Sequence, residues 1–183
     1  MTYCEYCREN PEDPWNVPYH EALYGFPVSE DDLLFERLVL EINQAGLSWL
    51  TILKKAGGFR RAYSGFSIDA VAAYGDSDRD RLLADPGIIR NRLKIEAAIG
   101  NARRLQQIRV THGSFNGWLA AHHPLDKKEW TKLFKKTFQF TGGEIVNEFL
   151  MSTGWLCGAH ETSCPVHKKI MNLDPPWALT KES

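Results

Sequence analysis

The residue with the clearest chemical potential is Glu41, which lies in an apolar stretch that ends at a glycine. Leu38, Glu41 and Ala45 recur at helical spacing, so a regular helix would turn the Glu41 carboxylate towards a core or a pocket. A carboxylate among apolar side chains is unfavourable unless it is protonated, paired or hydrogen-bonded, and such residues are common at functional sites. The structural alternative is a carboxylate satisfied by backbone N–H groups or by an arginine such as Arg37 or Arg90. The pattern alone leaves both interpretations open.

Candidate metal ligands gather near the two ends of the chain. They are Cys4, Cys7 and His20 in the N-terminal part and His160, Cys164 and His167 in the C-terminal part. Thiolates and imidazoles are the ligands that zinc prefers, and a structural site takes four of them in a closed tetrahedron. The alternative is a set of unrelated buried thiols and surface histidines. Spacing does not choose four of the six.

A group of cations follows the turn signal Asp85-Pro86-Gly87. Arg90, Arg92 and Lys94 lie at the expected start of a long helix, where free N–H groups and the positive end of the helix dipole favour a phosphate. Two helices joined by such a turn, over residues 85–95, resemble a helix-hairpin-helix unit, which binds the DNA backbone without reading sequence. Two further basic clusters, within residues 54–61 and 127–136, are typical of solvated faces.

The overall composition limits the class of protein. A chain of 183 residues with 43% hydrophobic and 25% charged content predicts one domain, residues 1–183, with a buried core. The net charge of -1 and pI of 6.6 give no global attraction to nucleic acid, so any DNA contact needs a local patch. No apolar run approaches the roughly 20 residues of a membrane span, and the N-terminus lacks the features of a signal peptide. We therefore expect a cytoplasmic protein with no membrane partner.

Hydrophobic periodicity predicts an all-α fold with short connections. Gly57-Gly58 is expected to break a helix, and Ser67 to cap one. Residues 1–28, rich in proline and aromatic side chains, are expected to form an irregular arm that must be pinned, and residues 173–183 a poorly ordered tail except for Trp177. The expected helices span about residues 30–45, 49–55, 59–63, 68–74, 78–84, 88–108, 115–121, 129–136 and 145–152.

Several stretches, taken in order, resemble the DNA-3-methyladenine glycosylase I family of helix-hairpin-helix base-excision repair enzymes. The resemblance covers nearly the whole chain and rests on Cys4, Tyr19-His20, Gly25-Phe26-Pro27, Leu40-Glu41-Ile42-Asn43-Gln44-Ala45-Gly46-Leu47-Ser48-Trp49, Gly87-Ile88-Ile89-Arg90-Asn91-Arg92-Leu93-Lys94-Ile95 and His160-x3-Cys164. It implies the family's helix-hairpin-helix fold, with a structural zinc that joins the two ends of the chain. The zinc ligands implied are Cys4, His20, His160 and Cys164, with Cys7, Cys157 and His167 as bystanders.

The resemblance also implies roles for individual residues. Glu41 would be the catalytic residue of a pocket for the extruded base, and Gly46-Leu47 would lie where the flipped nucleotide leaves a gap in the duplex. The aromatic pocket residues implied are Tyr19 and Trp49, and Tyr24 is expected to replace a tryptophan of the family there. The residues expected to contact DNA at the hairpin are Arg90, Arg92 and Lys94. The implied activity is hydrolytic release of 3-methyladenine from double-stranded DNA by a monomeric, monofunctional glycosylase.

The residue types fit this chemistry. Methylation at N3 makes adenine cationic and its glycosidic bond labile, so little leaving-group activation is needed. An aromatic face such as Trp49 attracts a cationic ring by about 0.5 to 2 kcal/mol, and Glu41 can accept hydrogen bonds from the adenine edge. Many enzymes of the superfamily carry a catalytic aspartate beyond the hairpin, but no acid stands between Glu96 and Asp126. The DNA-3-methyladenine glycosylase I family also lacks that aspartate, so this chain is similar to the family in this respect.

The sequence departs from the family pattern at several positions. Leu23-Tyr24-Gly25 stands where the family usually has Glu-Trp-Gly, Asn16 where an aromatic pocket residue can occur, and Leu93 where some members carry glycine in the hairpin. Residues 141–144 and 147–148 are more acidic than usual. Two alternatives therefore stay open, a glycosylase for another alkylated or cationic base and a non-catalytic zinc-stapled module that binds distorted DNA.

Overall fold

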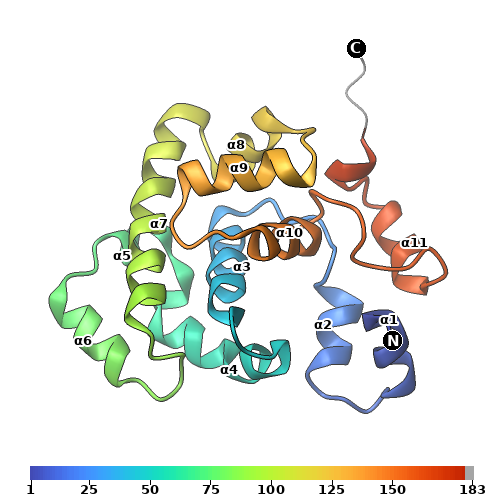
Figure 1. Cartoon of the computed structure of the whole chain (residues 1–183), viewed down its shortest axis with the longest axis horizontal. Coiled ribbons are helices and arrows are strands. Elements are labelled where there is room, and N and C mark those ends of the chain that lie inside the picture. Colours follow the sequence, from blue (N-terminus) through green and yellow to red (C-terminus); the bar gives the residue numbers. More distant parts are fainter. Residues whose placement is uncertain (180–183) are drawn as a thin grey trace.

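Helix α3 (Asp31–Gln44) runs through the centre of the molecule and carries Glu41 (Figure 1). In the computed structural model, which describes residues 1–179, every residue from Leu34 to Asn43 is buried. Helices α4 (Trp49–Ala62), α7 (Arg92–His112), α8 (Phe115–His122) and α10 (Gly143–Ser152) all contact α3. The described residues contain no strand. The prediction of an all-α fold is therefore confirmed.

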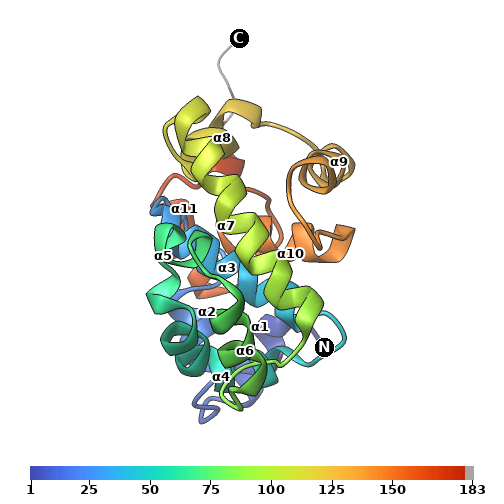
Figure 2. The ribbon, with the colours of Figure 1, turned by 90° about the vertical axis from the view of Figure 1, so that its left-hand side faces the viewer.

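The remaining helices complete a shell around α3. Helices α5 and α6 pack against the long α7, which crosses the face shown in Figure 2. Their bounds, with those of the other elements, are α1 (Tyr3–Glu9), α2 (Asn16–Ala22), α5 (Ile68–Ala72), α6 (Asp76–Ala84), α9 (Lys127–Thr137), α11 (Pro165–Met171) and two short 3-10 helices, Ser64–Phe66 and Pro176–Ala178. Among the described residues, no helix is both long and apolar enough to cross a bilayer.

Local capping explains several helix starts. The hydroxyl of Ser48 accepts a hydrogen bond from Thr51 N–H at the start of α4, and Ser67 caps α5 as predicted. The side chain of Asn91 accepts from Lys94 N–H, so α7 begins at Arg92 and not at residue 88. Each such bond satisfies a backbone N–H that the first helical turn leaves free. Residues 85–91 therefore form a longer turn than the sequence predicted.

The predicted break at Gly57-Gly58 is wrong, because α4 continues through both glycines to Ala62. A Cβ on Gly58 would collide with the carbonyl oxygen of Gly87 in the α6–α7 turn. Lys55 Nζ also donates a hydrogen bond to the carbonyl oxygen of Pro86 at 2.8 Å. Gly58 therefore lets the turn lie directly against the helix, which is a tertiary requirement and not a helix stop.

The predicted irregular arm over residues 1–28 is also wrong, because it contains α1 and α2. Thr2 and Glu5 form a capping box that starts α1, and its short length hid its periodicity. Helix α11 was not predicted, and residues 176–178 of the predicted tail form a 3-10 turn in which the Trp177 ring lies 6.1 Å from that of His167. Residues 180–183 of that tail lie outside the described residues.

Candidate active site

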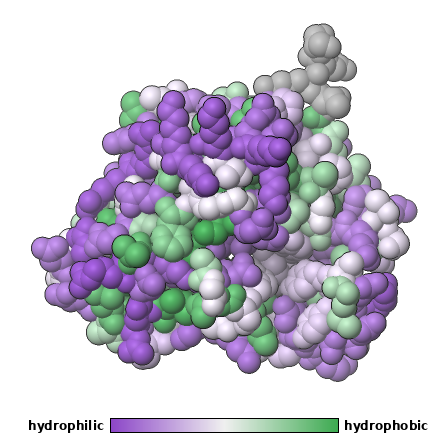
Figure 3. Space-filling view, viewed as in Figure 1, coloured by the Kyte–Doolittle hydropathy of each residue, from purple (hydrophilic) through white to green (hydrophobic). Residues whose placement is uncertain are grey.

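A cavity of about 310 Å³ opens where α1, α2, α3, α4 and α10 meet. In the view of Figure 3 the surface is hollowed to the right of centre, where these elements converge, and hydrophilic residues gather above it over α9. The cavity is lined by Tyr3, Tyr19, Tyr24, Glu41, Gln44, Trp49 and Glu148. The structure thus brings together all four pocket residues expected from the sequence, and it adds Tyr3, Gln44 and Glu148.

Glu41 is 3% exposed, and its carboxyl group has no hydrogen-bond partner within residues 1–179. The structural alternative, a bond to Arg37 or Arg90, is not observed, because Arg37 Nη1 donates instead to Tyr19 Oη at 3.3 Å. Burial and the nearby Glu148 raise the pKa of Glu41 to about 8, while the charge of Arg37 opposes the rise. A buried carboxyl group that faces a cavity without a partner is available to a ligand.

Aromatic rings form the other walls. The Tyr19 and Trp49 rings lie with centroids 5.1 Å apart, and those of Tyr19 and Tyr24 5.6 Å apart. Burial raises the pKa of Tyr19 and of Tyr24, so both phenols stay neutral. The Trp49 Nε1–H is buried and has no hydrogen-bond partner in the part of the chain that the structure describes. Such a pocket suits a flat, electron-poor ring that also offers hydrogen-bonding groups.

Glu148 was not among the predicted site residues. It is partly buried on α10, and its Oε2 accepts a hydrogen bond from Tyr24 Oη at 3.1 Å. Glu144, one turn earlier on the same helix, is exposed and bonds to Lys127. Periodicity could not separate the pocket acid from the surface acid, although the unusual acidity of residues 141–148 indicated that this wall differs.

Four of the six candidate metal ligands lie together. Cys4, His20, His160 and Cys164 place their donor atoms within 4.8 Å of one another. The Sγ of Cys4 lies 3.4 Å from His20 Nε2 and 3.6 Å from His160 Nδ1. The Sγ of Cys164 lies 3.7 Å and 3.8 Å from the same two nitrogens. Sulfur and nitrogen ligands of one tetrahedral zinc ion would lie about 3.5 Å apart, so the set is compatible with a metal site.

The surroundings of the cluster favour the same interpretation. His160 Nε2 lies 2.7 Å from the carbonyl oxygen of Tyr24 and must donate to it, which leaves the Nδ1 lone pair facing the two thiols. Gly25, at φ +82°, approaches so closely that a Cβ there would lie 2.7 Å from Ala159 Cβ. The cluster therefore joins the N-terminal helices to the C-terminal segment, whereas Cys7 and Cys157 lie outside it.

The loop that follows α3 projects from the pocket rim. Gly46 adopts φ +81° and is exposed, and the Leu47 side chain is 40% exposed. Lys94 is buried, and its Nζ donates to the carbonyl oxygens of Asn43 at 2.9 Å and Ala45 at 2.7 Å. This placement differs from the expected one, in which Lys94 faces a DNA phosphate. Lys94 instead neutralises the carbonyl end of α3 and connects the loop to α7.

The other two cations predicted to contact DNA lie at the surface. Arg90 and Arg92 are exposed and make no ion pair within residues 1–179. Leu93, which follows Arg92 in the first turn of α7, is 70% exposed. Exposed cations at a helix start, with an exposed apolar side chain beside them, suit a polyanionic surface.

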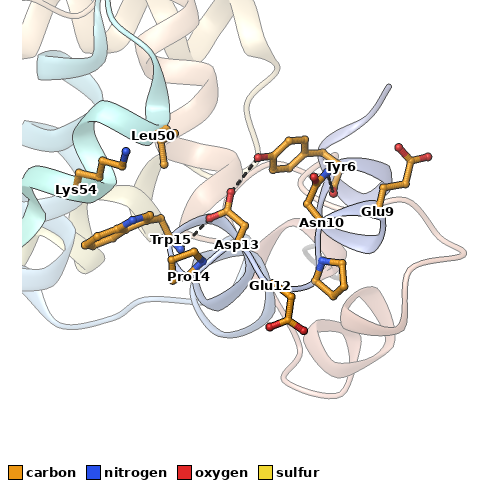
Figure 4. Close-up of a pocket in the computed structure, with 10 residues that line it drawn as sticks. Tyr6, Glu9, Asn10, Glu12, Asp13, Pro14, Trp15, Leu50 and Lys54 are labelled. Carbon is orange, nitrogen blue, oxygen red and sulfur yellow. Dashed lines mark hydrogen bonds between the residues drawn. The ribbon is translucent and has the colours of Figure 1, made fainter.

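A second hollow, of about 590 Å³, lies at the N-terminal end and has a different character (Figure 4). The carboxylate of Asp13 points into the group of labelled residues and accepts hydrogen bonds from Tyr6 Oη at 2.8 Å and Trp15 N at 2.9 Å. It also accepts from Asn16 N at 2.9 Å, and this bond contributes most to lowering the pKa of Asp13. The hydrogen bonds of Asp13 thus hold the start of α2 in place.

Comparisons with known proteins agree with the geometry. The family described as methyladenine glycosylase matches residues 9–133. DNA-3-methyladenine glycosylase 1 of Escherichia coli (strain K12) is 34% identical in an alignment of length 179 that covers 87% of this chain and 95% of the relative. The solved 3-methyladenine DNA glycosylase I from Staphylococcus aureus is similar with a TM-score of 0.78 at 31% identity, covering 90% of this chain and 97% of that one. A variant of 3-methyladenine DNA glycosylase I in complex with 3-methyladenine gives a TM-score of 0.79 at 31% identity, covering 91% and 97%. This chain therefore belongs to the methyladenine glycosylase family.

Proposed function

We propose that this protein is a DNA glycosylase that extrudes 3-methyladenine from alkylated double-stranded DNA and hydrolyses its N-glycosidic bond. The observation that carries the proposal is the Glu41 carboxyl group, which lies in an aromatic cavity of a methyladenine glycosylase family member and has no hydrogen-bond partner in the described part of the chain. The similar proteins of E. coli and S. aureus are named for this activity, and one similar structure holds 3-methyladenine.

The pocket would recognise the base by charge and shape. The Tyr19 and Trp49 rings offer π-faces to the cationic purine. Ionised Glu41 would accept hydrogen bonds from the exocyclic amino group, with charge assistance from the cation. The C1′–N9 bond then breaks with its electron pair passing to the base, which becomes neutral. The oxygen of water bonds to C1′, and a water proton passes to solvent.

DNA would be held by surfaces on both sides of the pocket mouth. The Gly46-Leu47 loop would fill the gap that the flipped nucleotide leaves, because Leu47 is the exposed apolar residue at its tip. Helices α6 and α7 with their turn would serve as the helix-hairpin-helix unit, and Arg90 and Arg92 would contact phosphates. Lys94 would act indirectly, by holding the loop in place relative to the hairpin.

The Cys4, His20, His160 and Cys164 cluster would hold one structural Zn²⁺ per chain. The ion would supply folding stability, because four protein ligands leave no open position for a substrate or water. The Tyr24 carbonyl oxygen contacts one of these ligands and its hydroxyl lines the pocket. Metal binding would thereby also fix one pocket wall.

The direct test is base release from duplex DNA treated with a methylating agent. The parent protein should release 3-methyladenine as the main free base, identified by chromatography, and leave the abasic strand uncut. Strand cleavage without added alkali would contradict a monofunctional enzyme. Duplex binding without release of any methylated base would favour the alternative of a non-catalytic module that binds damaged DNA.

A further inference from the structure

We propose that Glu148 is a second base-contacting acid, which works with Glu41 to make the pocket select bases that carry a positive charge. The inference rests on the proposed glycosylase function and names a specificity determinant for it. Glu148 on α10 and Glu41 on α3 line the same cavity. The Tyr24 hydroxyl bonds to Glu148 Oε2 at 3.1 Å and holds it at the cavity wall.

The charged groups around the cavity do not balance when both of its carboxyl groups are ionised. On α3, Arg37 is the buried guanidinium whose charge acts on Glu41, yet its hydrogen bond goes to the Tyr19 phenol. The other charges near Glu148 are Glu144 on α10 and Lys127 on α9, and these two pair with each other at 3.2 Å. The phenols that line the cavity are neutral, because burial raises the pKa of each; they belong to Tyr3, Tyr19 and Tyr24. Two carboxyl groups therefore line the cavity, and of these two the Arg37 charge acts on Glu41 alone.

A base that carries one positive charge supplies what is missing. With that base in place, the charges of Glu41, Glu148, Arg37 and the base sum to zero. In the empty pocket, Glu41 holds a proton instead, since burial and Glu148 together raise its pKa to about 8. Entry of the cation displaces this proton to solvent, whereas a neutral base of the same shape leaves a buried carboxylate uncompensated. The pocket thus discriminates by charge as well as by shape.

The test compares the parent with Glu148→Gln, which keeps the acceptor for Tyr24 and removes only the charge. The kcat/KM for 3-methyladenine release is measured from about pH 6 to about pH 9.5. In the parent it should rise with pH and level off above about 8, as Glu41 ionises. In the variant the rise should shift to lower pH, because the repulsion from Glu148 is gone, while the plateau falls roughly tenfold.

Two control variants lie on the same helix. Glu144→Gln removes a charge of the same sign from a side chain that is 85% exposed, and it should leave the profile unchanged. Glu148→Asp keeps the charge and should keep the midpoint of the profile close to that of the parent. Competitive inhibition of the parent by 3,9-dimethyladeninium, a permanent cation, should be at least roughly tenfold stronger than by neutral 9-methyladenine. This last measurement needs no variant to fold.

The outcomes separate the two proposals. A lower plateau without a shift of midpoint would assign Glu148 to packing and overturn the inference, as would equal inhibition by the two probes. Release of 3-methyladenine by the parent with an unchanged profile in Glu148→Gln would overturn the inference alone. A parent that releases no methylated base would overturn the proposed function, and the inference with it.

Discussion

The Cys/His cluster and the base pocket are both assembled from side chains far apart in the sequence, yet their polar groups are used differently. In the cluster, four donors face a common centre, and His160 is fixed from behind by the Tyr24 carbonyl. In the pocket, the Glu41 carboxyl group and the Trp49 Nε1–H have no hydrogen-bond partner among residues 1–179. Polar groups that face one another in the protein stabilise the fold. Polar groups that have no partner are available to a substrate that binds and dissociates. Burial alone does not distinguish the two.

The largest effect is expected when a ligand of the Cys/His cluster is removed. Cys164→Ala should abolish metal binding and lower the thermal midpoint by roughly 10 °C or more, because a structural zinc contributes directly to folding. Cys7→Ala is the control, because Cys7 is a buried cysteine outside the cluster. It is as buried as the cluster ligand Cys4 and lies with it on α1. It should retain one zinc per chain and lose about 1 kcal/mol of stability. Metal analysis and calorimetry measure both, and a metal-free parent that melts normally would contradict the site.

A smaller effect is expected where backbone packing holds the α6–α7 turn against α4. Gly58→Ala should lower the free energy of unfolding by about 1 to 3 kcal/mol, because the added Cβ meets the Gly87 carbonyl. It should also weaken duplex binding by displacing the turn. Gly57→Ala, one residue earlier, meets only Arg61 Nη1 at 3.5 Å and should instead stabilise the helix by up to about 1 kcal/mol. Equal effects of the two substitutions in denaturant titrations would show that the turn does not pack on Gly58.

The start of α7 shows the same contrast, because Lys94 bonds within the protein whereas Arg92 is exposed. Arg92→Ala should leave stability unchanged, weaken duplex binding alike on all sequences, and reduce the slope of log affinity against log salt by about 1. Lys94→Met should lower stability, because Lys94 bonds to two carbonyl oxygens. Arg104→Ala, near the middle of α7, is the control for a cation remote from the hairpin. An unchanged salt slope in Arg92→Ala would assign phosphate binding to another patch, such as residues 127–136.

The sequence predicted what local rules determine. Periodicity located α3 and α7, and the Ser67 cap located α5. The continuation of α4 through Gly58 could not be predicted, because Gly58 packs against a turn that contains Gly87 and is distant in the sequence.

The site was predictable to a similar degree. Glu41 stood out because a carboxylate interrupts an apolar helix face, and the resemblance supplied the four cluster ligands that spacing left ambiguous. Glu148 and Lys94 show the limit. Glu148 lines the cavity whereas Glu144 does not, and Lys94 is buried whereas its neighbouring cations are exposed. Neither difference follows from the local sequence pattern. Both depend on which neighbouring helix packs against that turn of the chain.

The central claim is that the buried Glu41 carboxyl group binds the base and lowers the stability of the protein without it. Glu41→Gln tests this claim most directly. Because folding raises the pKa of Glu41 from its ordinary value of 4.5 to about 8, the folded state holds a proton that the unfolded chain releases, and stability falls as pH rises through that window. The variant should therefore be more stable than the parent at pH 8, by about 1 to 3 kcal/mol, with the difference shrinking towards pH 4.5. It should lose most 3-methyladenine release while binding duplex DNA normally. A variant that is less stable and excises the base at the parental rate would contradict the account.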